Sequence, residues 1–252
     1  MADMDFINIT KENLPKEHLC CIIRTKKPHE GIEAKKRWLS ERLEEGHVFR
    51  KLSDKKAVVF IEYAPVETAW VPIEGKNFYY IYCLWVTGEY KGKGYGKALL
   101  EYCIDDAKDK GLCGVCLLGS KKQKAWLTDT EFAKRQGFIT ADTTENGYEL
   151  LALSFDGNLP RFCENAKKMR IESETLTVYY SHQCPYTLKG IEMIANQCTQ
   201  MGVPFELIEV DSLQKAKGLP CVFNNWALFY KGKFESVNLL LDTGKLKKYL
   251  EK

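Results

Sequence analysis

Residues 84–100 join an apolar stretch to a loop rich in glycine and lysine and then to an amphipathic stretch. Gly92, Gly94 and Gly96 stand where a helix is predicted to begin. Because they lack side chains, the backbone N–H groups at the positive end of that helix are open to an anion. Nearby lysines add ammonium groups that suit phosphates. They are Lys91, Lys93 and Lys97. The segment therefore predicts a site for a phosphorylated ligand, in particular a pyrophosphate.

Two common phosphate-binding loops have a different spacing. A Walker A loop places Ser or Thr directly after its lysine, whereas Ala98 follows Lys97 in this chain. The dinucleotide fingerprint G-x-G-x-x-G separates its last two glycines by two residues, but here the glycines alternate with single residues. Neither nucleotide-binding loop is therefore predicted.

The loop resembles the coenzyme A loop of the GNAT N-acetyltransferases, Q/R-x-x-G-x-G/A. Lys91, Gly94 and Gly96 occupy its positions, with Lys91 in place of the usual Gln or Arg. Leu84 and Val86 match the Leu-x-Val strand that precedes the loop. The resemblance implies acetyl-CoA as cosubstrate and no metal. The cofactor-binding residues that it implies are Leu84, Trp85, Val86, Lys91, Gly92, Lys93, Gly94, Tyr95, Gly96 and Lys97.

The family's chemistry implies direct attack of an amine on the thioester in a ternary complex. The pantetheine arm would lie in a splay between residues 78–86 and 113–118. Backbone N–H groups near Leu84 and Trp85 would polarise the thioester carbonyl. Residues 132–138 resemble a helix end of this family that often carries a tyrosine as general acid, but the chain has Ala133 at that position.

Glu62 is the candidate general base. Val58, Phe60 and Glu62 alternate along a predicted strand, so the carboxyl group is expected on the same face as two apolar side chains. A carboxyl group on such a face should have a raised pKa, which suits a base. The alternative is a solvated glutamate at the end of a strand.

The elements that position these residues predict an α/β domain. A buried strand over 78–86, a helix over 96–110 and a strand over 113–118 form a right-handed crossover with parallel strands. This order resembles the GNAT fold, a mixed β-sheet flanked by helices, over residues 1–168. The other predicted elements are a strand over 5–10, helices over 12–24, 30–45 and 126–136, a hairpin over 47–52 and 57–63, and a strand over 148–155.

A second, smaller α/β domain is predicted over residues 172–252, after a polar link. Its pattern is a strand, a helix and a strand, followed by a hairpin across Asn224-Asn225 and a final helix. The predicted ranges are 176–180, 185–201, 205–210, 221–223 and 227–230.

Cys184-Pro185-Tyr186-Thr187 resembles the active-site start of glutaredoxins, with Thr187 where a dithiol enzyme has its second cysteine. Pro220 resembles the cis-proline of thioredoxin-like folds. A GNAT domain joined to such a thioredoxin-like domain resembles the YoaP-type acetyltransferases. Cys184 is the candidate thiol, because a helix N-terminus stabilises a thiolate. The alternative is a domain kept for packing or for substrate recognition.

Composition excludes several classes. The 252 residues carry 37 basic and 34 acidic side chains, a balance that predicts neither nucleic acid nor a membrane surface as partner. No apolar run approaches the roughly 20 residues of a membrane span, and the acidic start is no secretory signal. Ten scattered cysteines then indicate reduced thiols in a cytoplasmic protein. Neither the pair Cys113 and Cys116 nor the four histidines have metal-ligand spacing, and surface or cap positions are expected for the histidines.

The sequence thus predicts an acetyl-CoA-dependent N-acetyltransferase whose acceptor is an amine, in a small molecule or a peptide. Two functions of other classes stay open. One is a thiol oxidoreductase that acts through Cys184, with the first domain regulatory; the other is a non-enzymatic acetyl-CoA sensor. The acceptor and the oligomeric state are not specified by any motif.

Overall fold

The computed structural model describes residues 4–19, 27–122, 124, 127–236 and 243–250. They form two compact units. The first unit comprises the described residues of 1–24, 39–69 and 73–162, and the second those of 25–38, 70–72 and 163–252. The second unit thus starts earlier than residue 172 and includes two segments expected in the first domain. These two segments contact each other through aromatic packing, because the rings of Trp38 and Trp70 meet edge to face with 5.9 Å between their centroids.

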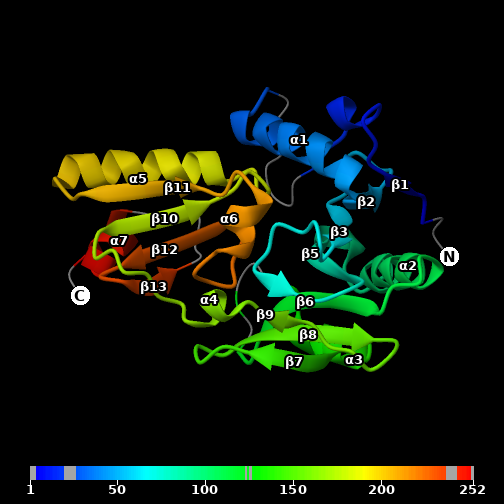
Figure 1. The fold of residues 1–252 in the computed structure, drawn as a ribbon. Helices are drawn as coiled ribbons and strands as arrows, with labels where there is room; N and C mark the ends of the chain where they lie inside the picture. Colours follow the sequence, from blue (N-terminus) through cyan, green and yellow to red (C-terminus); the bar gives the residue numbers. More distant parts are fainter. Residues whose placement is uncertain (1–3, 20–26, 123, 125–126, 237–242, 251–252) are drawn as a thin grey trace. The chain divides into compact units, whose positions relative to one another are not determined.

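The first unit is built on a seven-stranded sheet with the order β1-β2-β3-β5-β6-β8-β7 (Figure 1). Among its strands, β5 and β6 pair in parallel, and each other neighbouring pair is antiparallel. The predicted mixed α/β sheet is therefore confirmed. The strands are β1 (Phe6–Asn8), β2 (Val48–Leu52), β3 (Val59–Pro65), β5 (Phe78–Val86), β6 (Gly114–Ser120), β7 (Ile139–Thr143) and β8 (Tyr148–Ser154). A separate two-stranded pair joins β4 (Ile73–Glu74) to β9 (Arg161–Phe162).

Helix α2 (Tyr95–Asp109) provides the crossover between β5 and β6 and packs on one face of the sheet. Its buried side chains Leu99, Leu100 and Cys103 join those of β3 and β5 in the main core. Alternation along β3 directs Phe60 to the opposite face, where its ring stacks on Phe49 at 4.8 Å between centroids. Both faces of the central strands are thus covered, as their apolar sequence predicts.

Two predicted helices of the first unit need correction, and one strand was not predicted. Of the helix predicted over 12–24, residues 12–19 contain instead a short 3-10 turn, η1 (Leu14–Lys16), which ends because Glu17 is extended, and residues 20–24 lie outside the described residues. The helix predicted from 126 is shorter, α3 (Thr130–Arg135), and residues 125–126 lie outside the described residues. Strand β7 was not predicted, because its mostly exposed sequence Ile-Thr-Ala-Asp-Thr lacks an apolar alternation.

Helix α1 (Glu30–Arg42) begins in the second unit and passes into the first after Trp38. It continues as the 3-10 turn η2 (Leu43–Glu45) and ends at Gly46. These two elements match the single helix predicted over 30–45, because a 3-10 turn keeps nearly the same side-chain period as the last turn of an α-helix.

The second unit contains a four-stranded sheet with the order β11-β10-β12-β13. Strands β10 and β11 are parallel and joined by helix α5, whereas β12 and β13 run antiparallel to their neighbours. The core packs Leu176, Val178 and Leu228 of the sheet against Ile194 of α5. The strands are β10 (Leu176–Tyr180), β11 (Phe205–Glu209), β12 (Trp226–Tyr230) and β13 (Lys233–Ser236); the helices are α4 (Glu164–Lys167), α5 (Thr187–Met201), α6 (Leu213–Lys217) and α7 (Thr243–Leu250).

The hairpin predicted between residues 221–223 and 227–230 is wrong, because the second of these segments pairs with a different strand. Residues 221–223 form no strand, and β12 pairs instead with β13 across Lys231-Gly232. Both turn residues have positive φ, 49° and 73°, which is the conformation of a two-residue hairpin turn that matches strand twist. Pro220 also differs from the cis-proline that it resembles, because the described residues contain no cis peptide bond.

Candidate functional site

Strand β5 leaves its neighbour β6 halfway along its length. The ladder between them runs from Phe78 and Gly114 to Ile81 and Leu117, but β5 itself continues to Val86. At the same point β5 contains a bulge on its other side. There, successive residues of β3 face Ile81 and then Cys83, so the register skips Tyr82. A bulge bends its strand and increases its twist, which accounts for the opening between the two strands.

The loop after β5 exposes the start of α2. Gly92 and Gly94 have φ angles of 73° and 85°, in the left-handed region that favours glycine. Gly94 is the N-cap residue of α2, so no side chain covers the first N–H groups of the helix. A Cβ atom at Gly92 would meet nothing within 4 Å. The local geometry is therefore open to a ligand at the positive end of α2.

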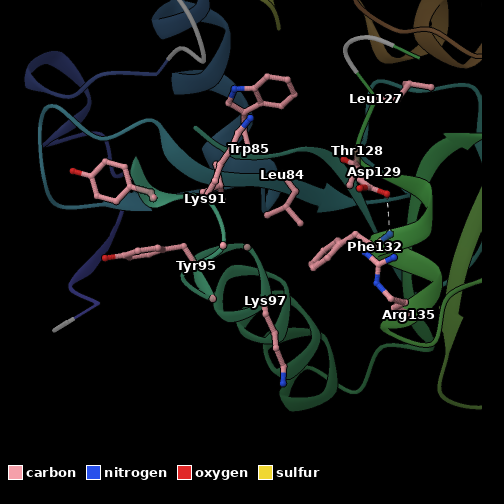
Figure 2. Close-up of a pocket in the computed structure, with 15 residues that line it drawn as sticks. Leu84, Trp85, Lys91, Tyr95, Lys97, Leu127, Thr128, Asp129, Phe132 and Arg135 are labelled. Carbon is pink, nitrogen blue, oxygen red and sulfur yellow. Dashed lines mark hydrogen bonds between the residues drawn. The ribbon is translucent and has the colours of Figure 1, made fainter. Parts of the chain in front are cut away.

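A cavity of about 640 Å³ lies between the end of β5, this loop and α3 (Figure 2). All the predicted cofactor-binding residues except Lys93 line it. Among the charged ones, Lys97 points away along α2, and its Nζ lies 3.6 Å from Glu101 (Figure 2). The lining residues are Leu84, Trp85, Val86, Tyr90, Lys91, Gly92, Gly94, Tyr95, Gly96, Lys97, Leu127, Thr128, Asp129, Phe132 and Arg135.

The far wall of the cavity was not predicted. Asp129 caps α3 by accepting a hydrogen bond of 2.9 Å from the backbone N of Phe132. Phe132 extends toward Leu84, and its ring tip lies 4.0 Å from where a Cβ of Gly96 would be (Figure 2). Arg135, one turn further on, adds a permanent positive charge to this wall. The capping aspartate three residues before Phe132 is the sequence signal that could have located the helix start.

Glu62 is completely buried in β3, with 0% of its surface exposed. The alternative of a solvated glutamate at a strand end is therefore wrong. Its Oε1 atom lies 3.1 Å from Nε2 of His47, which is itself 4% exposed. The His47 ring packs at 5.1 Å from the ring of Tyr82, the bulge residue of β5. The surface or cap position expected for His47 is therefore wrong, because its burial depends on a partner 15 residues away, on the next strand.

Tyr79 and Tyr80 of β5 and Ala133 of α3 are the other residues to consider as donors or acceptors of a proton. Burial raises the pKa of Tyr80 well above its ordinary value, so its phenol stays protonated. Burial also raises the pKa of Tyr79 to about 12. Ala133 is fully buried, and a methyl group cannot donate a proton. A general acid is thus not supplied from that position.

Cys184 of the second unit precedes α5 by three residues, in a turn. Its carbonyl accepts hydrogen bonds from the backbone N and the hydroxyl of Thr187, at 3.2 and 2.9 Å. The carbonyl of the preceding Gln183 accepts a bond of 2.7 Å from Lys35 of α1. A Cβ at Gly31 would come within 1.9 Å of the carbonyl oxygen of Pro185. The Cys184 side chain is partly buried and packs against the core of this unit.

The described cysteines form no disulfide, and their side chains build no metal site. Cys116 is buried in β6, where it faces Tyr80 across the parallel pair, as a strand residue rather than a ligand. In the described part of the chain, no three or more side chains of the metal-binding types gather as a metal would require. None of the described helices is both long and apolar enough to cross a membrane.

Comparison with known proteins gives matches for both units. Residues 13–145 match the family model described as the acetyltransferase (GNAT) family, and residues 204–248 match the model described as YoaP-like. The uncharacterized N-acetyltransferase YoaP of Bacillus subtilis is 38% identical over 233 residues, which cover 92% of each chain.

Solved structures of acetyltransferases are similar at lower levels. The PaiA N-acetyltransferase of Thermoplasma acidophilum, in complex with coenzyme A, is 20% identical over 52% of this chain and 81% of its own, with a TM-score of 0.38. Ard1 of Thermoplasma volcanium is 12% identical over 59% and 95%, with a TM-score of 0.41. Family membership rests on the family model and on the Bacillus relative, because TM-scores below 0.5 are too low to add to it.

Proposed function

The chain belongs to the GNAT acetyltransferase family and is an acetyl-CoA-dependent N-acetyltransferase, and from this premise we propose that the cavity at the end of β5 is its acetyl-CoA site. The observation that carries the proposal is that the β5–β6 ladder stops at Ile81 and Leu117 beside a cavity lined by the glycine loop. Acetyl-CoA supplies the activated acetyl group, and the acceptor is an amine of a small molecule or a peptide.

The loop suits the pyrophosphate of the cosubstrate. The first N–H groups of α2 have no intrahelical acceptor, and the helix dipole favours an anion at this end. Glycine at 92 and 94 lets a phosphate approach the backbone. Lys91 and Arg135 add positive charge from opposite walls of the cavity.

Two backbone N–H groups are directed toward the thioester position in this proposal. Thr87 donates its N–H to the carbonyl of Val58 at 3.0 Å, so its N–H points toward β3. N–H directions alternate along a strand, so those of Leu84 and Val86 point away from β3 and into the opening. Donors fixed there stabilise negative charge on a carbonyl oxygen. The proposed donors to the thioester carbonyl are therefore the N–H groups of Leu84 and Val86, in place of the expected groups near Leu84 and Trp85.

Glu62 is the general base of this proposal. An amine acceptor is protonated at neutral pH and must lose a proton before it attacks. Glu62 faces Cys83 across the β3–β5 pair, next to the bulge where the sheet opens. Its buried carboxylate can take the proton on an oxygen that is held in place by His47.

The test measures the turnover of acetyl-CoA with a panel of primary amines. The rate is read from the release of free coenzyme A. Glu62→Gln should lower the rate at neutral pH by about 10²-fold, and much of it should return at high pH, where the free amine dominates. The matched control is Glu74→Gln, which alters an exposed glutamate of the same unit paired with Arg161. A Glu62→Gln enzyme as fast as wild type at every pH would contradict the base assignment. No turnover with any amine would favour the sensor.

We further propose that the second unit is a thioredoxin-like domain with a role in packing or recognition. In support, parallel β10 and β11 are joined by α5, and antiparallel β12 and β13 follow in the order β11-β10-β12-β13. The hydrogen bonds that close the Cys184 turn favour packing over thiol exchange. The comparisons give the thiol oxidoreductase no support.

A further inference from the structure

The glycine loop that follows β5 has little stiffness of its own. Gly88, Gly92 and Gly94 all have positive φ angles, of 59°, 73° and 85°. Glycine loses more conformational freedom than any other residue when it becomes ordered. A Cβ atom at Gly88 or Gly92 would meet no described residue within 4 Å, so close packing around these two positions does not hold the loop. Its N–H groups must therefore be kept in place by the residues between and beside the glycines.

Tyr90 connects this loop to the turn between β2 and β3. It ends the 3-10 turn η3 (Gly88–Tyr90), directly before Lys91. Its hydroxyl donates a hydrogen bond of 2.7 Å to Oδ2 of Asp54, which lies 36 positions away in the chain. The other carboxylate oxygen of Asp54 accepts a bond of 2.8 Å from the backbone N of Lys56, so the turn fixes the acceptor. The loop and the turn are thus linked through two side chains.

The Tyr90–Asp54 hydrogen bond is of the charge-assisted kind. A bond from a hydroxyl to an ionised carboxylate is shorter and stronger than one between neutral groups, and 2.7 Å lies in the range of such bonds. This bond lowers the pKa of Asp54, and it raises the pKa of Tyr90 to about 12. At neutral pH the phenol is therefore a donor and the carboxylate an acceptor, as the link requires.

The Tyr90 ring also packs against the start of α2. Its centroid lies 5.5 Å from that of Tyr95, edge to face, and the Tyr95 ring meets Phe6 of β1 in the same way at 6.3 Å. Tyr95 is the first residue of α2 and is 6% exposed. Both tyrosines line the proposed acetyl-CoA cavity. Residues 91–94 therefore run between two aromatic residues that are each fixed to another part of the unit.

We propose that Tyr90 is a positioning residue for acetyl-CoA, whose hydroxyl, bound to Asp54, fixes the glycine loop in its binding conformation before the cosubstrate arrives. The inference rests on the acetyl-CoA site proposed above. Ordering a flexible loop during binding costs free energy, and a loop that is already held avoids that cost. The effect concerns the pyrophosphate and not the chemical step, because the proposed thioester donors, Leu84 and Val86, belong to β5 itself.

The experiment is a double-mutant cycle of Tyr90→Phe and Asp54→Ala, with acetyl-CoA affinity measured by calorimetric titration. Tyr90→Phe removes only the hydroxyl and should raise the Kd about fivefold. Asp54→Ala should raise it by a similar factor, and the double variant should bind no more weakly than either, because all three lack the same bond. The matched control is Tyr102→Phe, which removes a hydroxyl bonded to Asn8 at 3.0 Å and should bind as wild type.

Two further readouts distinguish positioning of the loop from a general loss of structure. With the fastest amine of the panel, Tyr90→Phe should raise the KM for acetyl-CoA by the same factor and leave kcat unchanged. In the free protein, the backbone amides of residues 91–94 should exchange with deuterium faster in Tyr90→Phe than in wild type, whereas those of β6 should not change. Equal exchange of the loop in the two proteins would overturn the proposal, because the loop would then be held without the hydroxyl.

The outcomes separate this proposal from the proposed site. If the wild-type protein does not bind acetyl-CoA, the site and the role of Tyr90 both fail. If the wild type binds it but Tyr90→Phe keeps the wild-type Kd, only the role of Tyr90 is overturned. The same holds if the losses of the two single variants add in the double variant, because the two side chains would then act independently.

Discussion

Helices α2 and α5 both have 15 residues and both follow a strand, yet their N-termini differ. Helix α2 starts after Gly94, which carries no side chain, and its first turn faces a cavity of about 640 Å³. Helix α5 starts after the turn at Gln183-Cys184-Pro185, in which the Cys184 carbonyl accepts a hydrogen bond from Thr187 and the Gln183 carbonyl accepts one from Lys35. One N-terminus is open, and the other is closed by its own unit.

The difference shows that a helix N-terminus binds a ligand only where the chain keeps space in front of it. Both helices have the same dipole and the same orphan N–H groups in their first turns. At α2, the bulge in β5 and two glycines in the left-handed region keep the approach clear. At α5, the carbonyl of Pro185 is in close contact with Gly31 of α1. A thiol placed before a helix is thus not in itself evidence of catalysis.

The largest effect is expected from closing the open terminus. Gly94→Asp places a negative charge beside the proposed pyrophosphate position and should weaken acetyl-CoA binding by about 2 kcal/mol or more, about thirtyfold. The matched control is Gly94→Asn, because both residues tolerate positive φ to a similar degree and differ in charge. Calorimetric titration measures both. Equal affinity of the folded Asp and Asn variants would remove the central claim about the loop.

A second change tests how tightly the other terminus is packed. Gly31→Ala would normally favour a helix, but here the new Cβ would lie 1.9 Å from the Pro185 carbonyl oxygen. Overpacking of this kind should lower the free energy of unfolding by about 2 kcal/mol. Urea unfolding measures the change, and acetyl-CoA affinity serves as the control because it should not move. A variant as stable as wild type would mean that the turn has room for a ligand.

A smaller loss is expected when the turn loses one hydrogen bond. Thr187→Val removes the hydroxyl that donates to the Cys184 carbonyl at 2.9 Å, in a side chain that is 1% exposed. The free energy of unfolding should fall by about 1 kcal/mol. Thr199→Val, at an exposed position of the same helix, should leave it nearly unchanged. Equal stability of the two variants would show that the hydroxyl does not close this turn.

The smallest effect is expected from the cysteine itself. Cys184→Ser should leave acetyl-CoA affinity unchanged, because the cavity lies in the first unit. In peptide mapping after brief iodoacetamide treatment, Cys184 should label no faster than Cys83, which is also partly buried. If Cys184 labels first and Cys184→Ser abolishes a disulfide-exchange activity, the thiol function gains its first support.

The open terminus could be predicted because its signals are local. Gly92, Gly94 and the apolar stretch before them lie within a few residues of one another, so their spacing alone indicates strand, loop and helix. The His47–Glu62 pair could not be predicted, because it depends on the register between β2 and β3.

The closed terminus was predicted only in part, because its environment comes from distant segments. The strand and helix around Cys184 follow the expected pattern. The contacts of Gly31 and Lys35 with the turn join residues about 150 positions apart, for which a single sequence carries no signal. The assignment of residues 25–38 to the second unit has the same cause.

The bulge at Tyr82 also resets the parity of strand β5. Before it, odd-numbered side chains such as Tyr79 and Ile81 enter the core beneath α2, and after it the even-numbered Leu84 does so. Deletion of this one residue would leave Leu84 on the core face, because Ile81, Cys83 and Leu84 would then alternate regularly against β3, but it would remove the bend at which β5 leaves β6. The number of residues in this strand is therefore as tightly constrained as their chemistry, because a strand one residue shorter would keep its core face and lose the opening.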